Sequence, residues 1–226
     1  MSSFITLSAD NFDETVDAAT ALINAGGIAV VAAEHGYLYV ANAFDHEAVR
    51  QIHILRGDAK GTASQVMIGS ADVLPGLAID FDDELKALAN EFWPGLLSLH
   101  VMGNAALTWD LGDSGELSEF AVRVPAKDFL RALAAKTGPL AAASAAIAGT
   151  GPSHEIQYVP AHESSIAIYI DEGALPPGPA SSVVHRQILG KPGGLELIRL
   201  GAISGERLQA VVPTLTLIAP VDPSVN

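Results

Sequence analysis

The sequence predicts an α/β or α+β domain built on a mixed β-sheet. Two patterns lead to this fold class: amphipathic helical segments alternate with short apolar runs over the first two thirds of the chain, and strand-like runs then dominate. A third observation is the composition, because 49% hydrophobic and 17% charged residues are typical of a globular chain with a sizeable core. Residues 1–212 are expected to form one domain, and residues 213–226, which hold three prolines and a polar end, a C-terminal tail.

Helices are expected where apolar residues recur at helical spacing between a capping residue and a helix breaker. In the first helix, Asp10 or Asn11 precedes the apolar stripe, and Gly26-Gly27 stops it. Pro125 occupies the favoured first position of another helix. Including the one that begins at Pro125, the further helices are expected over residues 45–57, 82–94, 125–138 and 204–211.

Strands are expected at short apolar runs that are rich in β-branched or small residues. The segment Leu175–Ala180 separates two of them and reads as a loop, because three of its six residues are proline. The expected strands are Ile28–Ala33, Gln65–Ile68, Leu97–Val101, Phe120–Val124, Leu140–Ser144, Ile166–Ile170, Ser181–Val184 and Leu195–Arg199.

The charge of the chain limits its partners. A formal charge of −14, from 26 acidic against 12 basic residues, opposes binding to nucleic acids and to anionic membranes, so we expect neither direct RNA binding nor a membrane partner. The chain contains no cysteine, which excludes disulfides, thiolate nucleophiles and cysteine-ligated zinc. Since no basic, apolar leader and no apolar stretch near 18 residues is visible, the sequence favours a cytoplasmic protein.

The common catalytic signatures are missing, and the sequence assigns no catalytic residue. Gly149–Gly151 is a lone glycine-rich turn and only a weak indication of phosphate binding. His46 and His53 lie two helical turns apart, which favours separate surface roles over a shared metal, so no metal site is expected. Arg123 falls inside an apolar strand and must find a partner there, either an acid in an internal ion pair or an anionic ligand.

Several motifs follow one another in a fixed order along the chain. They are Gly26-Gly27, FWPG at 92–95, RVP at 123–125, Pro139-Leu140 with Ser144 and Gly149 after it, SSVV at 181–184, and R-x-GAIS at 199–204. This series resembles the threonylcarbamoyladenylate synthase, or YrdC-like, family, and the resemblance spans residues 7–211. The combination of FWPG, RVP and R-x-GAIS is fairly specific.

The resemblance implies an open twisted sheet with helices around a concave cavity. It also implies the condensation of threonine, bicarbonate and ATP, with magnesium, into threonylcarbamoyl-AMP and pyrophosphate, for modification of adenosine 37 in transfer RNA. In this scheme the guanidinium of Arg123 holds the carboxylate of threonine. Positions that match the family suggest a substrate side with Glu34, Tyr37, Arg123 and Ser182. They suggest a nucleotide side with Arg56, Lys60, Ser144 and Arg199.

Departures from the family pattern are concentrated in this site. Pro-Thr-Asp-Thr is replaced by Ala32–His35, the Asn of Ser-Ala-Asn by Ala146, and the second base of Lys-x-Arg by Asp58. An anion about 4 Å from a phosphate oxygen costs on the order of 4 kcal/mol at an effective dielectric of 20. Together with lost hydrogen bonds, a penalty of about 5 kcal/mol weakens ATP binding by roughly several thousandfold. Lys60 is near enough in the sequence to swing in and offset part of this loss.

Two hypotheses of different classes remain open. In the first, the chain is an enzyme of the threonylcarbamoyl-AMP synthase type, or applies the same chemistry to another amine. In the second, it is a non-catalytic relative whose cavity binds a small ligand or a protein partner. The first hypothesis predicts pyrophosphate release from ATP, whereas the second predicts weak or absent binding of ATP.

Overall fold

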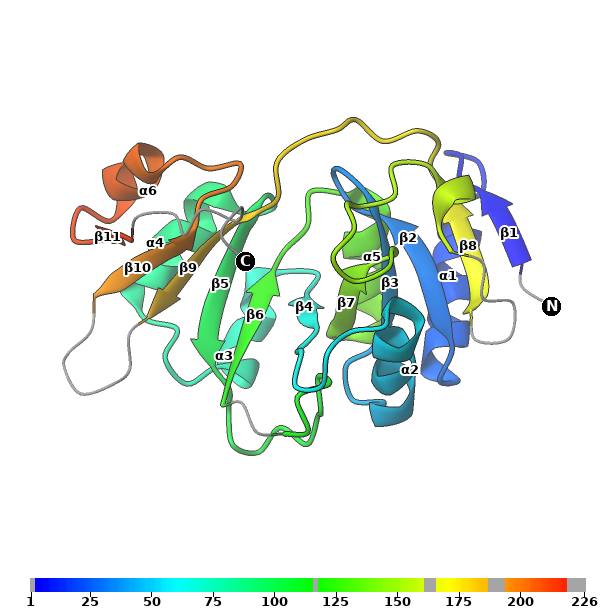
Figure 1. Cartoon of the computed structure of the whole chain (residues 1–226), viewed down its shortest axis with the longest axis horizontal. Coiled ribbons are helices and arrows are strands. Elements are labelled where there is room, and N and C mark those ends of the chain that lie inside the picture. The colour runs from blue at the N-terminus through cyan, green and yellow to red at the C-terminus, as the bar shows by residue number, and fades with distance from the viewer. Residues whose placement is uncertain (1–2, 116–117, 161–165, 187–193, 219–226) are drawn as a thin grey trace.

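One mixed β-sheet organises the molecule. The computed structural model describes residues 3–115, 118–160, 166–186 and 194–218. Their eleven strands pair in the order β1-β8-β2-β3-β7-β4-β6-β5-β9-β10-β11, and Figure 1 shows that the sheet is open and twisted. The fold class predicted from the sequence is confirmed. The strands are Ser3–Thr6 (β1), Ile28–Ala32 (β2), Tyr37–Asn42 (β3), Gln65–Met67 (β4), Leu97–Met102 (β5), Glu119–Arg123 (β6), Leu140–Ser144 (β7), Ile166–Asp171 (β8), Ser182–Arg186 (β9), Leu195–Arg199 (β10) and Thr216–Leu217 (β11).

Residues 172–181, which we call the crossing loop, connect the two ends of this sheet. β8 and β9 are consecutive in the chain, yet six strands lie between them: β2, β3, β7, β4, β6 and β5. The loop therefore runs across the molecule, and it is visible along the top of Figure 1. It contains Leu175–Ala180, which the sequence predicts to be a loop, and that prediction is confirmed.

Helices cover both faces of the part of the sheet around β2. Ala29 and Val31 of β2 pack in one cluster with α1 (Phe12–Asn24) and α5 (Asp128–Thr137). Ile28 and Val30, which point to the opposite face, pack in another cluster with α2 (His46–Arg56). Because β2 is buried on both faces, it reads in the sequence as a continuous apolar run.

The other part of the sheet has its own hydrophobic cluster. Phe120 and Val122 of β6 pack there with Leu99 of β5 and with apolar residues of three helices. The guanidinium of Arg207 lies 5.3 Å from the ring centre of Phe92, which adds a cation–π contact between two of these helices. The three helices are Leu74–Leu77 (α3), Asp83–Phe92 (α4) and Gly205–Val211 (α6).

Several elements differ from the sequence-based expectations. α5 begins at Asp128 rather than Pro125, because the backbone of residues 125 and 126 bonds to the side chains of Glu34 and Arg131 instead of starting the helix. β1 and β3 were not expected. β11 lies inside the predicted tail and pairs with β10, while residues 219–226 of that tail lie outside the described residues.

Candidate functional site

A cavity of about 390 Å³ is lined by residues of the central strands β7, β4 and β6 and by residues 178–181 of the crossing loop. Its polar wall is built from the last residues of β6, β7 and β10 and from the segment after β2. The end of α2, the start of β4 and the end of the crossing loop complete it. Residues far apart in the sequence therefore meet there. Five of the eight predicted site residues line the cavity: Glu34, Arg56, Arg123, Ser144 and Arg199.

The other three predicted residues lie outside the cavity lining. Tyr37 is fully buried, and its hydroxyl donates to the carbonyl of Gly173 at 2.8 Å and accepts from the backbone N–H of Glu172 at 3.0 Å. Burial raises the pKa of Tyr37. The hydroxyl of Tyr37 thus anchors the start of the crossing loop. Lys60 is exposed and is not among the residues that line the cavity.

Ser182 is also fully buried and is engaged within the fold. Its hydroxyl donates to the carbonyl of Ile203 at 2.7 Å and accepts from the backbone N–H groups of Gly201 and Ile203, each at 3.0 Å. These bonds hold the R-x-GAIS turn against β9. The neighbouring Ser181 lines the cavity instead, because successive residues of an extended chain point to opposite sides.

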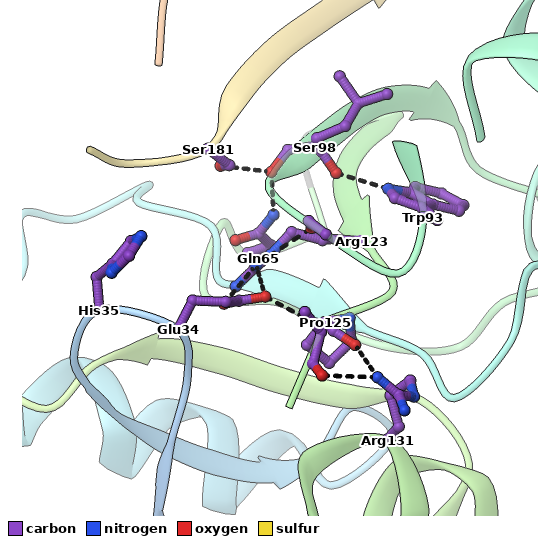
Figure 2. A network of polar contacts seen from close by, with 12 residues as sticks. Glu34, His35, Gln65, Trp93, Ser98, Arg123, Pro125, Arg131 and Ser181 are labelled. Atoms are coloured by element: carbon purple, nitrogen blue, oxygen red, sulfur yellow. Dashed lines mark hydrogen bonds and ion pairs between the residues drawn. The ribbon is translucent and has the colours of Figure 1, made fainter. Parts of the chain in front are cut away.

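The cavity wall near β6 contains an ion pair between Arg123 and Glu34 (Figure 2). Nη1 of Arg123 lies 2.8 and 2.7 Å from the two carboxylate oxygens of Glu34, and the backbone N–H of Ala126 donates to the same carboxylate at 2.7 Å. Only 6% of the Arg123 side chain and 12% of the Glu34 side chain are exposed. Burial opposes ionisation of Glu34, but the charge and hydrogen bonds of Arg123, with that backbone N–H, hold its pKa below the usual value.

A second ion pair, at the end of α2, corrects the expected effect of Asp58. Its carboxylate Oδ2 accepts from Nε of Arg56 and from Nδ1 of His53, both at 2.9 Å, and 5% of its side chain is exposed. The negative charge is therefore offset within the protein. The cost of about 4 kcal/mol expected for an uncompensated anion next to a phosphate does not apply to this geometry.

His53 connects this ion pair to a neighbouring loop. Its Nε2 lies 2.8 Å from the carbonyl oxygen of Leu111 and 3.0 Å from the hydroxyl of Ser64. An acceptor therefore faces each ring nitrogen: the carboxylate of Asp58 at Nδ1 and the carbonyl of Leu111 at Nε2. Although Ser64, His53 and Asp58 are in hydrogen-bond contact, a histidine that donates to Leu111 is not a base for the serine. Gly112 permits this approach, since a Cβ there would lie 2.1 Å from Nε2.

Arg56 also fixes the loop after β7. Its Nη1 donates to the carbonyl oxygens of Ser144 and Ala146, the latter at 3.2 Å. Ala146 is buried and lies outside the cavity lining, so the family's asparagine is missing from a position that this chain uses for packing.

A chain of hydrogen bonds joins Gln65 to Ser181, both in the cavity wall, through the buried Ser98 (Figure 2). Nε2 of Gln65 donates to Ser98 at 2.6 Å, and the hydroxyls of Ser98 and Ser181 lie 2.8 Å apart. Arg199 donates from Nη2 to the Ser181 hydroxyl at 2.9 Å and from Nε to the Ser181 carbonyl at 3.0 Å. Within the described residues these are the hydrogen bonds of Arg199, and no carboxylate is among its partners. Partial burial and the nearby charge of Arg123 lower the pKa of Arg199.

Sequence reasoning did not find His53, Gln65, Ser98 or Ser181 as residues of this site. A usable signal existed for Ser181, since it adjoins Ser182 in the SSVV motif. His53 gave none, because its role depends on Leu111, which is 58 residues away in the chain. In the part of the chain that the structure describes, no group of three metal-ligating side chains is placed to hold a metal ion. In that same part, no helix is long and apolar enough to cross a membrane.

The model of the Sua5/YciO/YrdC family, described as telomere recombination, matches residues 21–201. The chain belongs to this family. A Mycobacterium tuberculosis protein whose name assigns it provisionally to the threonylcarbamoyl-AMP synthases is 30% identical over 196 residues, which cover 86% of this chain and 87% of that protein. Membership in the family, predicted from the order of the motifs, is confirmed.

Solved structures agree with this assignment. Sua5 of Pyrococcus abyssi in complex with L-threonine superposes with a TM-score of 0.83 at 25% identity, covering 96% of this chain and 62% of that one. E. coli YciO gives a TM-score of 0.76 at 17% identity and covers 92% of this chain and 100% of that one, which supports the fold alone. This chain thus spans less than two thirds of the Pyrococcus protein.

Proposed function

We propose that the cavity binds ATP and threonine and condenses them with bicarbonate into threonylcarbamoyl-AMP, the precursor for modification of adenosine 37 in transfer RNA. The observation that carries this proposal is Arg199. It is a guanidinium in the cavity wall whose hydrogen bonds, within the described residues, go to Ser181 and to no carboxylate. Arg199 and Arg123 both line the cavity, and burial, together with the charge of Arg123, lowers the pKa of Arg199, so an anionic ligand beside Arg199 would favour its charged form.

The residues present fit a triphosphate on one side of the cavity. Arg199 supplies a guanidinium whose hydrogen bonds go to Ser181, and the negative charge of Asp58 in the same wall is offset by its ion pair with Arg56. Magnesium accompanies the ATP as part of the substrate. The amine of threonine and bicarbonate form a carbamate with loss of water, and a carbamate oxygen then attacks the α-phosphorus and displaces pyrophosphate. The guanidinium of Arg199 would bind and orient the phosphates and stabilise the charge that develops there.

The names of similar proteins support the same activity. A 30% identical relative from Pyrococcus abyssi is named threonylcarbamoyl-AMP synthase, and the alignment covers 83% of this chain and 56% of that protein. A structural neighbour from the same organism was solved with L-threonine. Threonine is therefore the first amine to test.

The test is release of pyrophosphate from ATP in the presence of bicarbonate and threonine. We expect release that depends on threonine and falls at least about tenfold in Arg199→Ala, because a charge-assisted contact with phosphate is worth about 1.5–3 kcal/mol. Arg50→Ala is the matched control, since Arg50 is exposed and pairs with Glu47 on α2, outside the cavity. A folded protein without release above the enzyme-free background would contradict the proposal.

A second candidate is a non-catalytic relative that binds a small ligand or a protein partner. Two observations favour it: Glu34 already pairs with Arg123, and Lys60 lies outside the cavity lining. Calorimetry with ATP and magnesium separates the candidates. Micromolar affinity supports the enzyme, whereas absence of binding supports the second candidate.

A further inference from the structure

The carboxylate of Glu34 is bound in the way in which a ligand's carboxylate would be bound. It receives two contacts from Nη1 of Arg123, at 2.7 and 2.8 Å, and a third from the backbone N–H of Ala126 at 2.7 Å. A guanidinium combined with a backbone N–H is a typical donor set for a free carboxylate. Glu34 also lines the cavity, so its carboxylate is held at the wall where a substrate enters.

The fit of Glu34 to Arg123 is incomplete. Both carboxylate oxygens share one nitrogen, Nη1, which also lies 3.3 Å from the carbonyl oxygen of Gly95. Nε of Arg123 is buried and has no hydrogen-bond partner among the described residues. The two-point arrangement, in which two nitrogens face two oxygens, is therefore not formed. A free carboxylate is not limited by the length of a glutamate side chain and can form that arrangement.

We propose that Glu34 is an internal competitor for the carboxylate of the amino-acid substrate at Arg123, and that it sets the affinity of the site for that substrate. The inference rests on the proposed function, in which threonine is the amine. Binding of threonine then requires that the Glu34 carboxylate leaves Arg123 and the N–H of Ala126. Since Glu34 faces the cavity, rotation of its own side chain is enough, and the backbone turn closed by the hydrogen bond from Ala33 N–H to Gly36 stays in place.

Calorimetric titration with L-threonine tests this proposal in wild type and in Glu34→Ala. We expect the variant to bind threonine at least about tenfold more tightly, because threonine then has no carboxylate to displace from Arg123 and the N–H of Ala126. The matched control is Glu172→Ala. Glu172 pairs with Lys127 at 2.8 Å and is similarly buried, with 15% of its side chain exposed, but it lies outside this cavity. Its threonine affinity should equal that of wild type.

Two probes identify the group that is recognised. L-Threoninol, which lacks the carboxylate, should gain no affinity in Glu34→Ala. Sodium acetate should compete with threonine in Glu34→Ala but not in wild type at the same concentration. A gain that threoninol shares would overturn the proposal, because the change would then reflect a wider cavity and not a vacated carboxylate position.

The outcome that overturns the inference is an unchanged or weaker threonine affinity in folded Glu34→Ala. If that variant does not fold, Glu34→Gln replaces it, since the amide keeps the shape and loses the charge, and the same gain in a smaller amount is expected. ATP is titrated in parallel. If wild type does not bind ATP, the proposed function is refuted. If wild type binds ATP but Glu34→Ala shows no gain in threonine affinity, this inference alone is refuted.

Discussion

Asp58 illustrates how the partners of a residue decide the effect of its charge. In the sequence it replaces a base of the related family, and alone it would repel a phosphate. In the fold it lies between Arg56 and His53, and 5% of its side chain is exposed. Arg56 in turn holds the loop after β7 through the carbonyls of Ser144 and Ala146. Asp58 is thus a part of the structure that orients Arg56.

The first prediction concerns the stability that Asp58 provides. In Asp58→Ala the largely buried guanidinium of Arg56 loses its counterion and Nδ1 of His53 loses its acceptor, so we expect the free energy of unfolding to fall by about 3 kcal/mol. Urea denaturation followed by circular dichroism measures this change. Asp83→Ala on α4 is the control, because its side chain is fully exposed and solvent screens its contact with Lys86. Equal losses in both variants would contradict the role of Asp58.

The second prediction concerns the dependence of stability on pH at Glu34. Burial opposes its ionisation, but Arg123 and the N–H of Ala126 keep its folded-state pKa below the unfolded value, which is about 4.3. The ion pair therefore adds stability above that unfolded value, and this part is lost as the pH falls through the lower folded-state pKa.

The variant Glu34→Gln isolates this contribution. Between pH 7 and pH 3 (about the range in which carboxylates titrate), we expect the unfolding free energy of wild type to fall more steeply than that of the variant. Urea denaturation at several pH values provides the comparison, and Glu91→Gln, at an exposed position of α4, serves as the control. Parallel curves for wild type and Glu34→Gln would refute the ion-pair account.

For single residues, the sequence predicted that a side chain requires an interaction partner more reliably than it predicted which residue that partner is. It showed that Arg123 requires an acid or an anion, and it could not choose between them, because Glu34 lies 89 residues away in the chain and the folded sheet alone brings the two together. Ser182 was taken for a cavity residue, although the pleat of β9 turns its side chain inward. The prediction was one residue off: Ser181 lies in the cavity wall, and Ser182 is a buried structural residue.

At the scale of elements, β9 and the turn after β10 behave as one unit. The hydroxyl of Ser182 makes three hydrogen bonds to the backbone of Gly201 and Ile203. Close contact is needed there, since a Cβ at Gly201 would lie 2.3 Å from the carbonyl oxygen of Ala180. The R-x-GAIS motif is therefore required for the packing of this turn against β9 as well as for the site.

The third prediction separates the two serines of this unit. In Ser182→Ala two buried N–H groups and a carbonyl lose their partner, and we expect a loss of about 2–3 kcal/mol in unfolding free energy. In Ser181→Ala we expect little change in stability and weaker binding of ATP, because Arg199 loses one of its two anchors. Urea denaturation and calorimetry measure the two effects. If Ser181→Ala were the less stable variant and Ser182→Ala the one with weaker ATP binding, Ser181 would be the structural residue and Ser182 the residue of the site.

Element boundaries were predicted best where capping chemistry is local. Asp45 and Asp82 accept from the backbone N–H groups of Ala48 and Leu85 and so cap α2 and α4, as expected, and Gly57 ends α2 with a positive φ of 68°. β7 has the predicted bounds. β3 was missed, although its aromatic and branched residues favour a strand, because the motif around Tyr37 was read as part of the site. Tertiary contacts of Ala126 likewise outweighed the helix-starting preference of Pro125.

At the scale of the whole molecule, the charge of −14 remains the main constraint on partners. The fourth prediction is that the protein is not retained on RNA at physiological ionic strength, since too few basic side chains are present to release counterions from phosphates. Filter binding with transfer RNA at a series of salt concentrations measures retention. Tight binding that weakens steeply with added salt would refute this prediction.

The pairing of β8 has a consequence for synthesis of the chain. Ser3 of β1 and Ala29 of β2 both lie opposite Ile168, so the strands made first flank one that is made late. Neither β1 nor β2 can complete its hydrogen bonds until the ribosome has released residues beyond β8. Until β8 has been made, the edge of β2 that pairs with it has no neighbouring strand, and an exposed strand edge is a site of aggregation. Binding by a chaperone during synthesis would protect that edge.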